Sequence, residues 1–532
     1  MPALLDEFAG KVNLIYIDPP FDTGADFSFT AAVPDAPDDQ DAGSLAFTKE
    51  PSIIEQKAYR DTWGRGLDSY LQWFYETVTI LHDLLAENGS IYVHLDWRMM
   101  HYGKVILDEV FAKECFLNEI VWAYFAFKRS TAKKFPQKHD IIISYHKSEK
   151  WIWNTQFKPH KGEYLKRWKV DADGQYYRDD VNPTKGGTRV IYLDELEGDI
   201  VDSVWDDIPP VNPVAAERQN YPTQKPEALL ERIVKASSNE DDLILDCFSG
   251  SGTTAAVAEK LNRRWIACDL GRFAVHTTRK RLLNVENVRP FVVQNLGKYE
   301  RQHWQTGQFA ASAEPLAGAQ GLLLKQQQAY IDFMLKLYHA QPLTGRTLLH
   351  GVKVEFKRAM GTGKGAPTTN GVDLLGWDFA FEVNEVARQQ AERANLDLRF
   401  LRIPREVMEK KAVDQGDVKF FELAALEVAV KTKKLDAALS LTNFIIPPDD
   451  VPEEVRKAVT HWSQWIDYWA VDWNHGGDAF HNEWQSFRTR KQPKLELSVP
   501  HTYEKAGEYN VVVKVIDILG NDTTKTVKVV VK

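Results

Sequence analysis

The tetrapeptide Asp18-Pro19-Pro20-Phe21 combines residue types that could carry out chemistry on an amine. The two prolines fix the backbone and remove two N–H donors, which leaves the Asp18 carboxylate and the proline carbonyls as rigid acceptors. Such acceptors could bind the two hydrogens of an exocyclic amine and turn its lone pair toward an electrophilic methyl group. Phe21 could stack on an extruded base. An ordinary Asp-Pro turn is the alternative, and the apolar run before the motif favours chemistry.

Residues 246–254 form a glycine-rich segment with the sequence Asp-Cys-Phe-Ser-Gly-Ser-Gly-Thr-Thr. Between a predicted strand and a predicted helix, Gly250 and Gly252 would let the backbone approach a ligand closely, near free N–H groups of the helix. The spacing matches neither the three-glycine dinucleotide motif nor a phosphate-binding loop. The next predicted strand ends in Asp269, where an acid in such folds binds ribose hydroxyls. The segment predicts a nucleoside site, with a structural glycine turn as the alternative.

Short apolar runs that alternate with amphipathic segments must position these two motifs. Residues 12–17 are expected to form a buried strand that ends directly at Asp18. The other expected strands are residues 90–95, 140–145, 242–247 and 264–269, and the expected helices are residues 70–86, 102–111, 226–237, 254–261 and 273–283. This alternation predicts an α/β fold with a doubly wound, mostly parallel, Rossmann-like sheet. Residues 22–62, rich in Asp, Ala and Pro, are expected to form a mobile surface loop.

Together the motifs resemble those of the β-class DNA amino-methyltransferases of restriction–modification systems, and most closely those of type III modification subunits. The resemblance covers about residues 10 to 300 and rests on four segments in the family's order. These are the catalytic motif Asp18-Pro19-Pro20-Phe21, His139–Tyr145, Tyr221–Pro226, and the Phe-x-Gly-x-Gly pattern of Phe248, Gly250 and Gly252. Each motif is modest alone, but four in this order are specific.

The resemblance implies S-adenosyl-L-methionine as the cofactor and double-stranded DNA as the substrate. Family members with Asp at the first motif position generally act on N6 of adenine and those with Ser on N4 of cytosine, so Asp18 favours adenine. The expected cofactor-binding residues are Phe248, Gly250, Gly252, Thr253, Asp269, Lys225 and Pro226. The alternatives are a DNA-binding subunit that has lost catalysis, an N4-cytosine methyltransferase, and a methyltransferase of RNA or small molecules.

The family usually carries a strand and an Asp-Asn-Leu segment before the catalytic strand. Only eleven residues precede Val12, so either the start is truncated or another segment completes the cofactor site. The partners that the resemblance allows, besides DNA, are a second copy of the chain in a homodimer and a restriction subunit with helicase and nuclease activity.

A basic segment interrupts an otherwise acidic chain. The formal net charge is -9, yet residues 128–189 hold 15 Lys and Arg against 7 Asp and Glu, a net charge of +8, interleaved with aromatic residues. This composition predicts a local nucleic-acid surface, with a solvated loop region as the alternative. The expected DNA-binding residues are Lys128, Arg129, Lys133, Lys134 and Lys138.

The length of 532 residues predicts several domains. We expect a catalytic half, a target-recognition insertion, a cofactor-binding half, an α/β region and a β-rich module, at residues 1–150, 151–215, 216–300, 316–480 and 481–532. The three scattered cysteines lack disulfide or metal spacing, and neither a secretory signal nor a membrane span is expected, so the chain is expected to be cytoplasmic, with no bound metal.

The C-terminal region offers fewer functional signals. Residues 371–379, 382–394 and 396–403 predict a strand–helix–strand unit, and alternating valines around Gly520 predict a terminal β-hairpin similar to a polycystic-kidney-type β-sandwich repeat. The segment Glu355-Phe356-Lys357 resembles half of a nuclease motif, but no upstream Asp completes it. A packing stripe at helical spacing is expected from Trp462, Trp465, Trp469 and Trp473.

Overall fold

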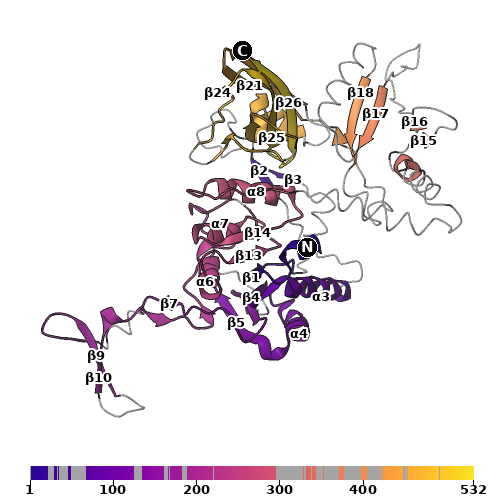
Figure 1. Cartoon of the computed structure of the whole chain (residues 1–532). Helices are drawn as coiled ribbons and strands as arrows, with labels where there is room; N and C mark the ends of the chain where they lie inside the picture. The colour runs from indigo at the N-terminus through magenta and orange to yellow at the C-terminus, as the bar shows by residue number, and fades with distance from the viewer. Residues whose placement is uncertain are drawn as a thin grey trace. The chain divides into compact units, whose positions relative to one another are not determined.

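The computed structural model describes residues 2–21, 67–124, 133–219, 221–294 and 425–532, with short gaps inside these ranges, and isolated segments within residues 29–49 and 328–422. The chain divides into two compact units: residues 1–29 with 55–289, and residues 30–54 with 290–532. The first unit contains both sequence motifs (Figure 1). None of the described helices is long and apolar enough to cross a membrane.

The first unit is built on a seven-stranded sheet. In spatial order, its strands are β12 (Val204–Trp205), β5 (Phe116–Ala123), β6 (His139–His146), β4 (Leu85–Leu95), β1 (Val12–Ile17), β13 (Leu243–Asp246) and β14 (Arg264–Ala267). β1 pairs in parallel with both β4 and β13. Within this sheet, only β6 runs antiparallel to its neighbours. The mostly parallel sheet expected from the sequence is confirmed.

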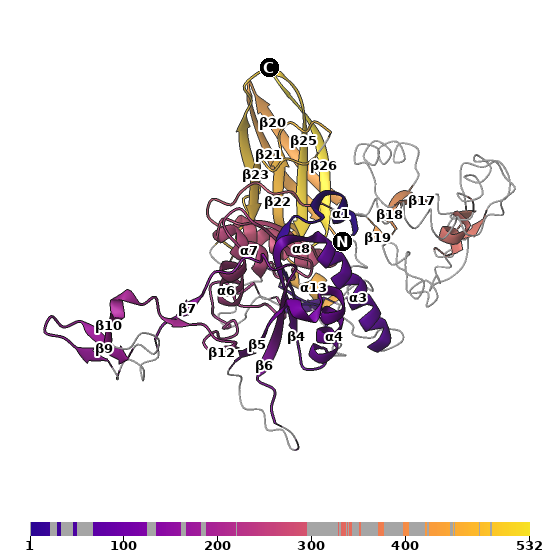
Figure 2. The ribbon, with the colours of Figure 1, turned by 60° about the horizontal axis from the view of Figure 1, so that its bottom comes forward.

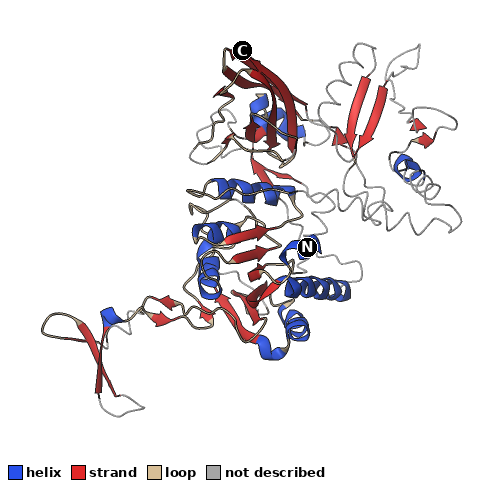
Figure 3. Ribbon diagram, viewed as in Figure 1, coloured by secondary structure: helices blue, strands red, loops and turns tan. Residues whose placement is uncertain are grey.

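Helices cover both faces of this sheet (Figure 3). One face carries α3 (Leu67–Leu84) and α4 (Met100–Phe111), with α1 (Pro2–Phe8) beside α3; the other carries α6 (Glu227–Ser237) and α7 (Thr253–Lys260), and α8 (Arg272–Leu283) packs against α7. Two layers of helices around one sheet constitute the doubly wound arrangement, which is therefore confirmed.

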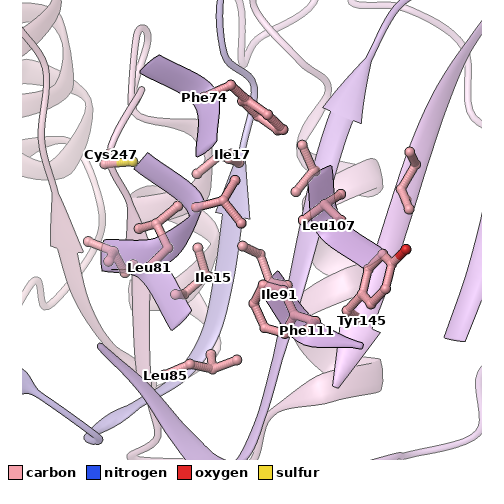
Figure 4. Close-up of a cluster of buried hydrophobic side chains, with 14 of the residues drawn as sticks. Ile15, Ile17, Phe74, Leu81, Leu85, Ile91, Leu107, Phe111, Tyr145 and Cys247 are labelled. Atoms are coloured by element: carbon pink, nitrogen blue, oxygen red, sulfur yellow. The ribbon is translucent and has the colours of Figure 1, made fainter. Parts of the chain in front are cut away.

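β1 shows how the sequence produces two cores. Ile15 and Ile17 join the cluster with α3 and α4 that Figure 4 draws, whereas Leu14 and Tyr16 join the core against α6. Successive side chains of a strand point to opposite faces, so a wholly apolar strand is buried on both sides. These four side chains are at most 2% exposed. A strand held this firmly delivers Asp18 to a fixed place at the edge of the sheet.

The expected recognition region lies mostly outside the central sheet. Its strands are β7 (Phe157–Lys158) paired with β11 (Asp199–Ile200), and β8 (Lys169–Val170), β9 (Tyr176–Val181) and β10 (Thr188–Tyr192) in a three-stranded sheet. Figure 2 labels β9 and β10, which form an antiparallel hairpin. β12 falls inside the expected range 151–215 but pairs with β5. The chain therefore rejoins the central sheet before residue 215.

The second unit contains a β-sandwich near the C-terminus. One sheet holds β20 (Ala425–Lys433), β21 (Asp436–Ile445) and β24 (Ser498–Thr502), and the other holds β23 (Trp484–Phe487), β22 (Ile466–Asp472), β25 (Gly507–Asp517) and β26 (Asp522–Val531). The expected hairpin is confirmed, since β25 and β26 pair in antiparallel around Gly520. Strands on both sides of residue 480 share one core, so the sandwich extends across the expected boundary there.

The four tryptophans at helical spacing do not lie on an α-helix. Trp462 and Trp465 bound a short 3-10 helix, and Trp469 lies on β22, which ends just before Trp473. The helical expectation is wrong because a spacing of four residues also returns to the same face of a strand. The packing role is confirmed, since Trp469 and Trp473 are 0% and 3% exposed in the sandwich core.

Two further regions, residues 22–62 and residues 371–403, can be compared with the structure that their sequences predict. Residues 22–62, expected to be loop, contain the paired strands β2 (Phe29–Ala32) and β3 (Ala46–Lys49), where aromatic and Thr residues favour strand in spite of the Asp-rich surroundings. β17 (Gly371–Gly376) and β18 (Asp397–Arg402) pair in parallel, as the expected strand–helix–strand unit requires. The helix expected at 382–394 and the segment at 355–357 lie outside the described residues.

Candidate active site at the carboxyl edge of the sheet

Both sequence motifs follow strands of the central sheet at the point where each strand ends. β1 ends directly before Asp18, and β13 ends at Asp246, where the glycine loop begins. Because β1 and β13 are parallel neighbours, their carboxyl ends lie at the same edge of the sheet. β1 also has β4 on its other side, so the strand order changes direction here. Open α/β sheets bind ligands at such a switch point.

Asp18 forms an ion pair with Lys225, a residue expected on the cofactor side of the site. The Lys225 ammonium donates a hydrogen bond to Asp18 Oδ2, and the side chains of Lys225 and Asp18 are only 12% and 18% exposed, respectively. Lys225 Nζ also lies 5.9 Å from the centroid of the Phe21 ring. The structure thus brings Lys225 into direct contact with the Asp18-Pro19-Pro20-Phe21 motif.

The second carboxylate oxygen of Asp18, Oδ1, differs from Oδ2 in its hydrogen bonding. Oδ1 is buried and has no hydrogen-bond partner among the described residues. A buried acceptor without a partner costs roughly 1–3 kcal/mol, so such atoms often mark the place of a ligand. The group that would satisfy Oδ1 is an N–H or O–H donor, and an amine of a substrate is one.

A buried histidine, His94, packs against one face of the Phe21 ring. The His94 ring is 0% exposed and stacks with Phe21 at a centroid distance of 6.2 Å. Its Nδ1 is hydrogen-bonded to the Tyr16 hydroxyl at 2.9 Å and its Nε2 to the Asp140 carboxylate at 3.3 Å. Trp122 meets the ring edge-on at 5.7 Å. Both ring nitrogens are therefore satisfied, and the ring itself forms a wall beside Phe21.

The pKa values of Asp140 and Tyr16, the two hydrogen-bond partners of His94, are both shifted. Burial would raise the pKa of Asp140, but the hydrogen bond and charge of His94, together with the charge of Lys225, outweigh burial and lower it. Burial, followed by the charge of nearby Asp18, raises the pKa of the Tyr16 hydroxyl well above its ordinary value. At neutral pH, Asp140 is thus a fixed negative charge and Tyr16 is a neutral hydroxyl.

The glycine loop turns through two left-handed residues. Gly250 and Gly252 have φ angles of 48° and 72°, a conformation that favours glycine. The Gly250 N–H donates to Asp269 Oδ2 at 2.8 Å, and the Gly271 N–H donates to Asp269 Oδ1 at 2.9 Å. Asp269 therefore fixes the loop to the end of β14. A contact between Asp269 and a ribose stays a prediction.

Neighbouring side chains also require both glycines. A Cβ atom at Gly250 would lie 3.1 Å from the ring of Tyr221, and one at Gly252 would lie 2.7 Å from the Thr278 side chain. The Thr278 hydroxyl in turn donates to the Gly250 carbonyl at 3.3 Å. The loop is closely packed by the chain itself, independently of any ligand.

Thr253 and Asp246 anchor the two ends of the loop. Thr253 Oγ1 donates to the Lys225 carbonyl at 3.1 Å and accepts from Arg281 Nη1 at 2.7 Å. Asp246 accepts from the Thr254 hydroxyl at 2.6 Å. Burial is the main cause that raises the pKa of Asp246 to about 7. Side-chain hydrogen bonds thus hold both ends of the glycine loop in place.

Two of the basic residues expected to bind DNA, Lys133 and Lys138, precede β6 at the same edge as Asp18, because β6 runs antiparallel to β4 and begins where β4 ends. Lys133 is exposed and Lys138 half-buried, and Phe135 between them is 96% exposed. The other expected residues, Lys128, Arg129 and Lys134, lie outside the described residues.

An aromatic–cation pair follows β4 at this edge. Asp96 accepts the Arg98 backbone N–H at 2.8 Å and pairs with its guanidinium. The guanidinium carbon of Arg98 lies 4.8 Å from the ring centroid of Trp97, which is 50% exposed. Such an exposed pair can contact bases and phosphates.

A family model described as DNA methylase matches residues 12–280. The match begins with β1 and ends within α8, so it contains both motifs and the ion pair of Asp18 with Lys225. The chain belongs to the DNA methylase family. S-adenosylmethionine is the cofactor of this family.

Several characterised relatives are similar to this DNA methylase. The type II methyltransferase M.EcaI of Enterobacter cloacae is 28% identical over 316 residues, 51% of this chain and 64% of the relative. The DNA adenine methyltransferase YhdJ of Escherichia coli is 28% identical over 262 residues, 49% and 73% of the two chains. The StyLTI Mod subunit, a type III restriction-modification enzyme of Salmonella typhimurium, is 22% identical over 348 residues, 52% and 51%. The chain spans less than two thirds of the M.EcaI enzyme.

The residues of this DNA methylase fit a nucleoside cofactor. A loop with two left-handed glycines follows β13, and an acid follows the next strand at the same edge. Of the other expected residues, Phe248 is half-buried against Trp73, with ring centroids 5.8 Å apart, and Pro226 is buried at the start of α6. The glycine loop is therefore the part of the chain that would hold the cofactor.

Several groups that the structure brings to the site carry only weak signals in the sequence. From the sequence alone, a satisfied structural histidine is the favoured interpretation of His94, at the end of the strand expected at 90–95, with a pocket-lining residue as the alternative. In the structure its ring contacts Phe21, and Asp140 and Tyr16 bind its two ring nitrogens. A signal was available, because Asp140 is the second residue of β6 and His94 is the next-to-last residue of the neighbouring strand β4. Polar residues at strand ends of a parallel sheet face the ligand edge.

Proposed function

We propose that this chain transfers a methyl group from S-adenosylmethionine to N6 of adenine in duplex DNA. The observation that carries the proposal is the state of Asp18. Its Oδ1 is buried without a partner among the described residues, and Asp18 directly follows β1, the parallel neighbour of the strand β13 that leads into the glycine loop. An amine hydrogen is the donor that this oxygen needs, and family membership supplies the methyl donor.

The chemistry follows from the acceptors of the motif. Bound S-adenosylmethionine supplies a methyl group that its sulfonium has already activated, so the transfer needs no strong base. Asp18 Oδ1 accepts one amine hydrogen and the Pro19 carbonyl accepts the other, which turns the lone pair toward the methyl group. Positive charge grows on the nitrogen as the N–C bond forms, and the Asp18 carboxylate stabilises it most in the transition state. As the N–C bond forms, the bond between the methyl carbon and sulfur breaks and its electron pair stays on sulfur, which leaves as the neutral thioether S-adenosylhomocysteine. The methylated nitrogen then loses its extra proton to water.

Phe21 captures the base. The target atom is inaccessible within a duplex, so the nucleotide must leave the stack before transfer. Phe21 is half-buried and backed by His94, so it offers one ring face on a rigid support. The stacking energy of a base on an aromatic ring is about 1–3 kcal/mol.

Adenine is the favoured base for two reasons. The motif carries Asp18 at its first position, and the printed name of the relative YhdJ is DNA adenine methyltransferase. The similarity to the StyLTI Mod subunit, and to restriction-modification methyltransferases in general, favours a place in a defence system, with a restriction subunit as the further partner.

The test is methyl transfer from tritiated S-adenosylmethionine to DNA, followed by digestion and separation of the nucleosides. We expect label in N6-methyladenine. Label in N4-methylcytosine would overturn the adenine assignment. Cofactor binding without any labelled product, on DNA containing every short sequence, would show that catalysis has been lost. Long-read sequencing of DNA from expressing cells identifies the target sequence.

A further inference from the structure

Lys225 connects the two halves of the site. Its side chain binds Asp18 Oδ2, and its backbone carbonyl accepts the hydroxyl of Thr253 at 3.1 Å. Thr253 is the first residue of α7, directly after the glycine loop. One residue therefore touches the catalytic carboxylate with its ammonium group and the cofactor loop with its main chain.

The ion pair makes the two oxygens of Asp18 inequivalent. Oδ2 is occupied by the ammonium, whereas Oδ1 has no partner among the described residues. A carboxylate with both oxygens unbound could rotate and present either one. Here the rotation is blocked by a charge-assisted bond, which is among the strong hydrogen bonds of proteins.

The Lys225 ammonium also offsets the negative charge of the carboxyl groups around Asp18. Asp140 and Asp246 are both close enough to Asp18 to belong to one electrostatic cluster, since each raises the pKa of Tyr16 together with Asp18. Lys225 opposes this negative charge, because it also lowers the pKa of Asp140. Without it, several carboxyl groups would repel one another at the place where the amine must dock.

We propose that Lys225 is a positioning residue for methyl transfer: it holds Asp18 so that Oδ1 alone receives the amine hydrogen, and Thr253 ties this arrangement to the cofactor loop. The inference rests on the proposed function. It differs from the role expected from the sequence, in which Lys225 binds the cofactor itself.

The experiment compares Lys225→Met with Lys225→Arg in single-turnover methyl transfer, alongside calorimetric affinities for S-adenosylmethionine and for DNA. Misplacing a reacting group by about 1 Å can cost roughly 100-fold in rate. We therefore expect Lys225→Met to lose about 100-fold in the transfer rate, with both affinities unchanged, and Lys225→Arg to recover part of the rate. Lys235→Met is the matched control, since Lys235 is an exposed lysine of α6 that pairs with Glu231.

A double-mutant cycle tests the contact itself. In an Asp18→Asn background the carboxylate charge is absent, so Lys225→Met should cost far less than it does in the wild type. Equal losses in both backgrounds would overturn the proposal, and so would a loss of cofactor affinity that accounts for the lost rate. A normal rate in Lys225→Met would refute the inference alone, whereas a wild type that methylates no DNA would refute the proposed function as well.

Discussion

Gly252→Ala tests the account of the glycine loop. The added Cβ would lie 2.7 Å from Thr278 Cγ2 and Oγ1 and 2.9 Å from its Cα, and φ is +72°. The left-handed backbone costs about 1 kcal/mol for a residue with a side chain, and overpacking costs about 1–3 kcal/mol more. We expect the free energy of unfolding of the first unit to fall by about 2–4 kcal/mol in chemical denaturation.

Cofactor affinity should fall with it, because Thr278 also binds the Gly250 carbonyl at 3.3 Å. Gly10→Ala is the control: φ is +67° there, and no atom of the residues that the structure describes lies within 4 Å of the added Cβ. It should lose only the backbone cost of about 1 kcal/mol. Thr278→Ala should restore part of the stability lost in Gly252→Ala. Equal losses at the two glycines, or no rescue by Thr278→Ala, would refute the packing argument.

Three further predictions concern DNA, pH and the base. Replacing Lys133, Lys134 and Lys138 by Ala should weaken DNA binding evenly across sequences and flatten its log–log salt slope by roughly 0.9 per lost phosphate contact; an unchanged slope would place the DNA elsewhere. The pKa of Asp246 is raised from 3.8 to about 7 in the fold, so the unfolded chain loses this proton first and stability falls as pH rises between these values. Asp246→Asn should remove that part of the pH dependence of the free energy of unfolding. Phe21→Ala should weaken capture of an extruded base, measured by 2-aminopurine fluorescence at the target, while Phe21→Trp should retain it.

Local patterns made much of the fold and both motifs predictable. A wholly apolar strand before Asp18 and a glycine loop between a strand and a helix each carry their structural context within about ten residues of sequence. The strands at β1, β4, β6, β13 and β14 followed from this alternation and are confirmed. β5 and the two-residue strand β12 carry too little periodic signal to be separated from the loops around them.

Contacts between distant segments could not be predicted in the same way. Lys225 and Asp18 are 207 residues apart, and His94 and Tyr16 are 78 apart. No local pattern specifies such pairs, because they depend on the order of strands in the sheet. The tryptophans around Trp469 illustrate the opposite difficulty: a spacing of four fits a helix face and a strand face equally well.

Methyl transfer by Asp18→Ala, measured beside calorimetric binding of S-adenosylmethionine, decides whether the Asp18 carboxylate is the acceptor for the substrate amine. The carboxylate has lost its role as acceptor in this variant, while the glycine loop, held by Asp269 and Thr278, is untouched. Loss of one preorganised group at the reacting atom costs roughly 100- to 1000-fold. We expect at least about a 100-fold loss of labelled N6-methyladenine with unchanged cofactor affinity. Full transfer activity in Asp18→Ala would contradict this expectation.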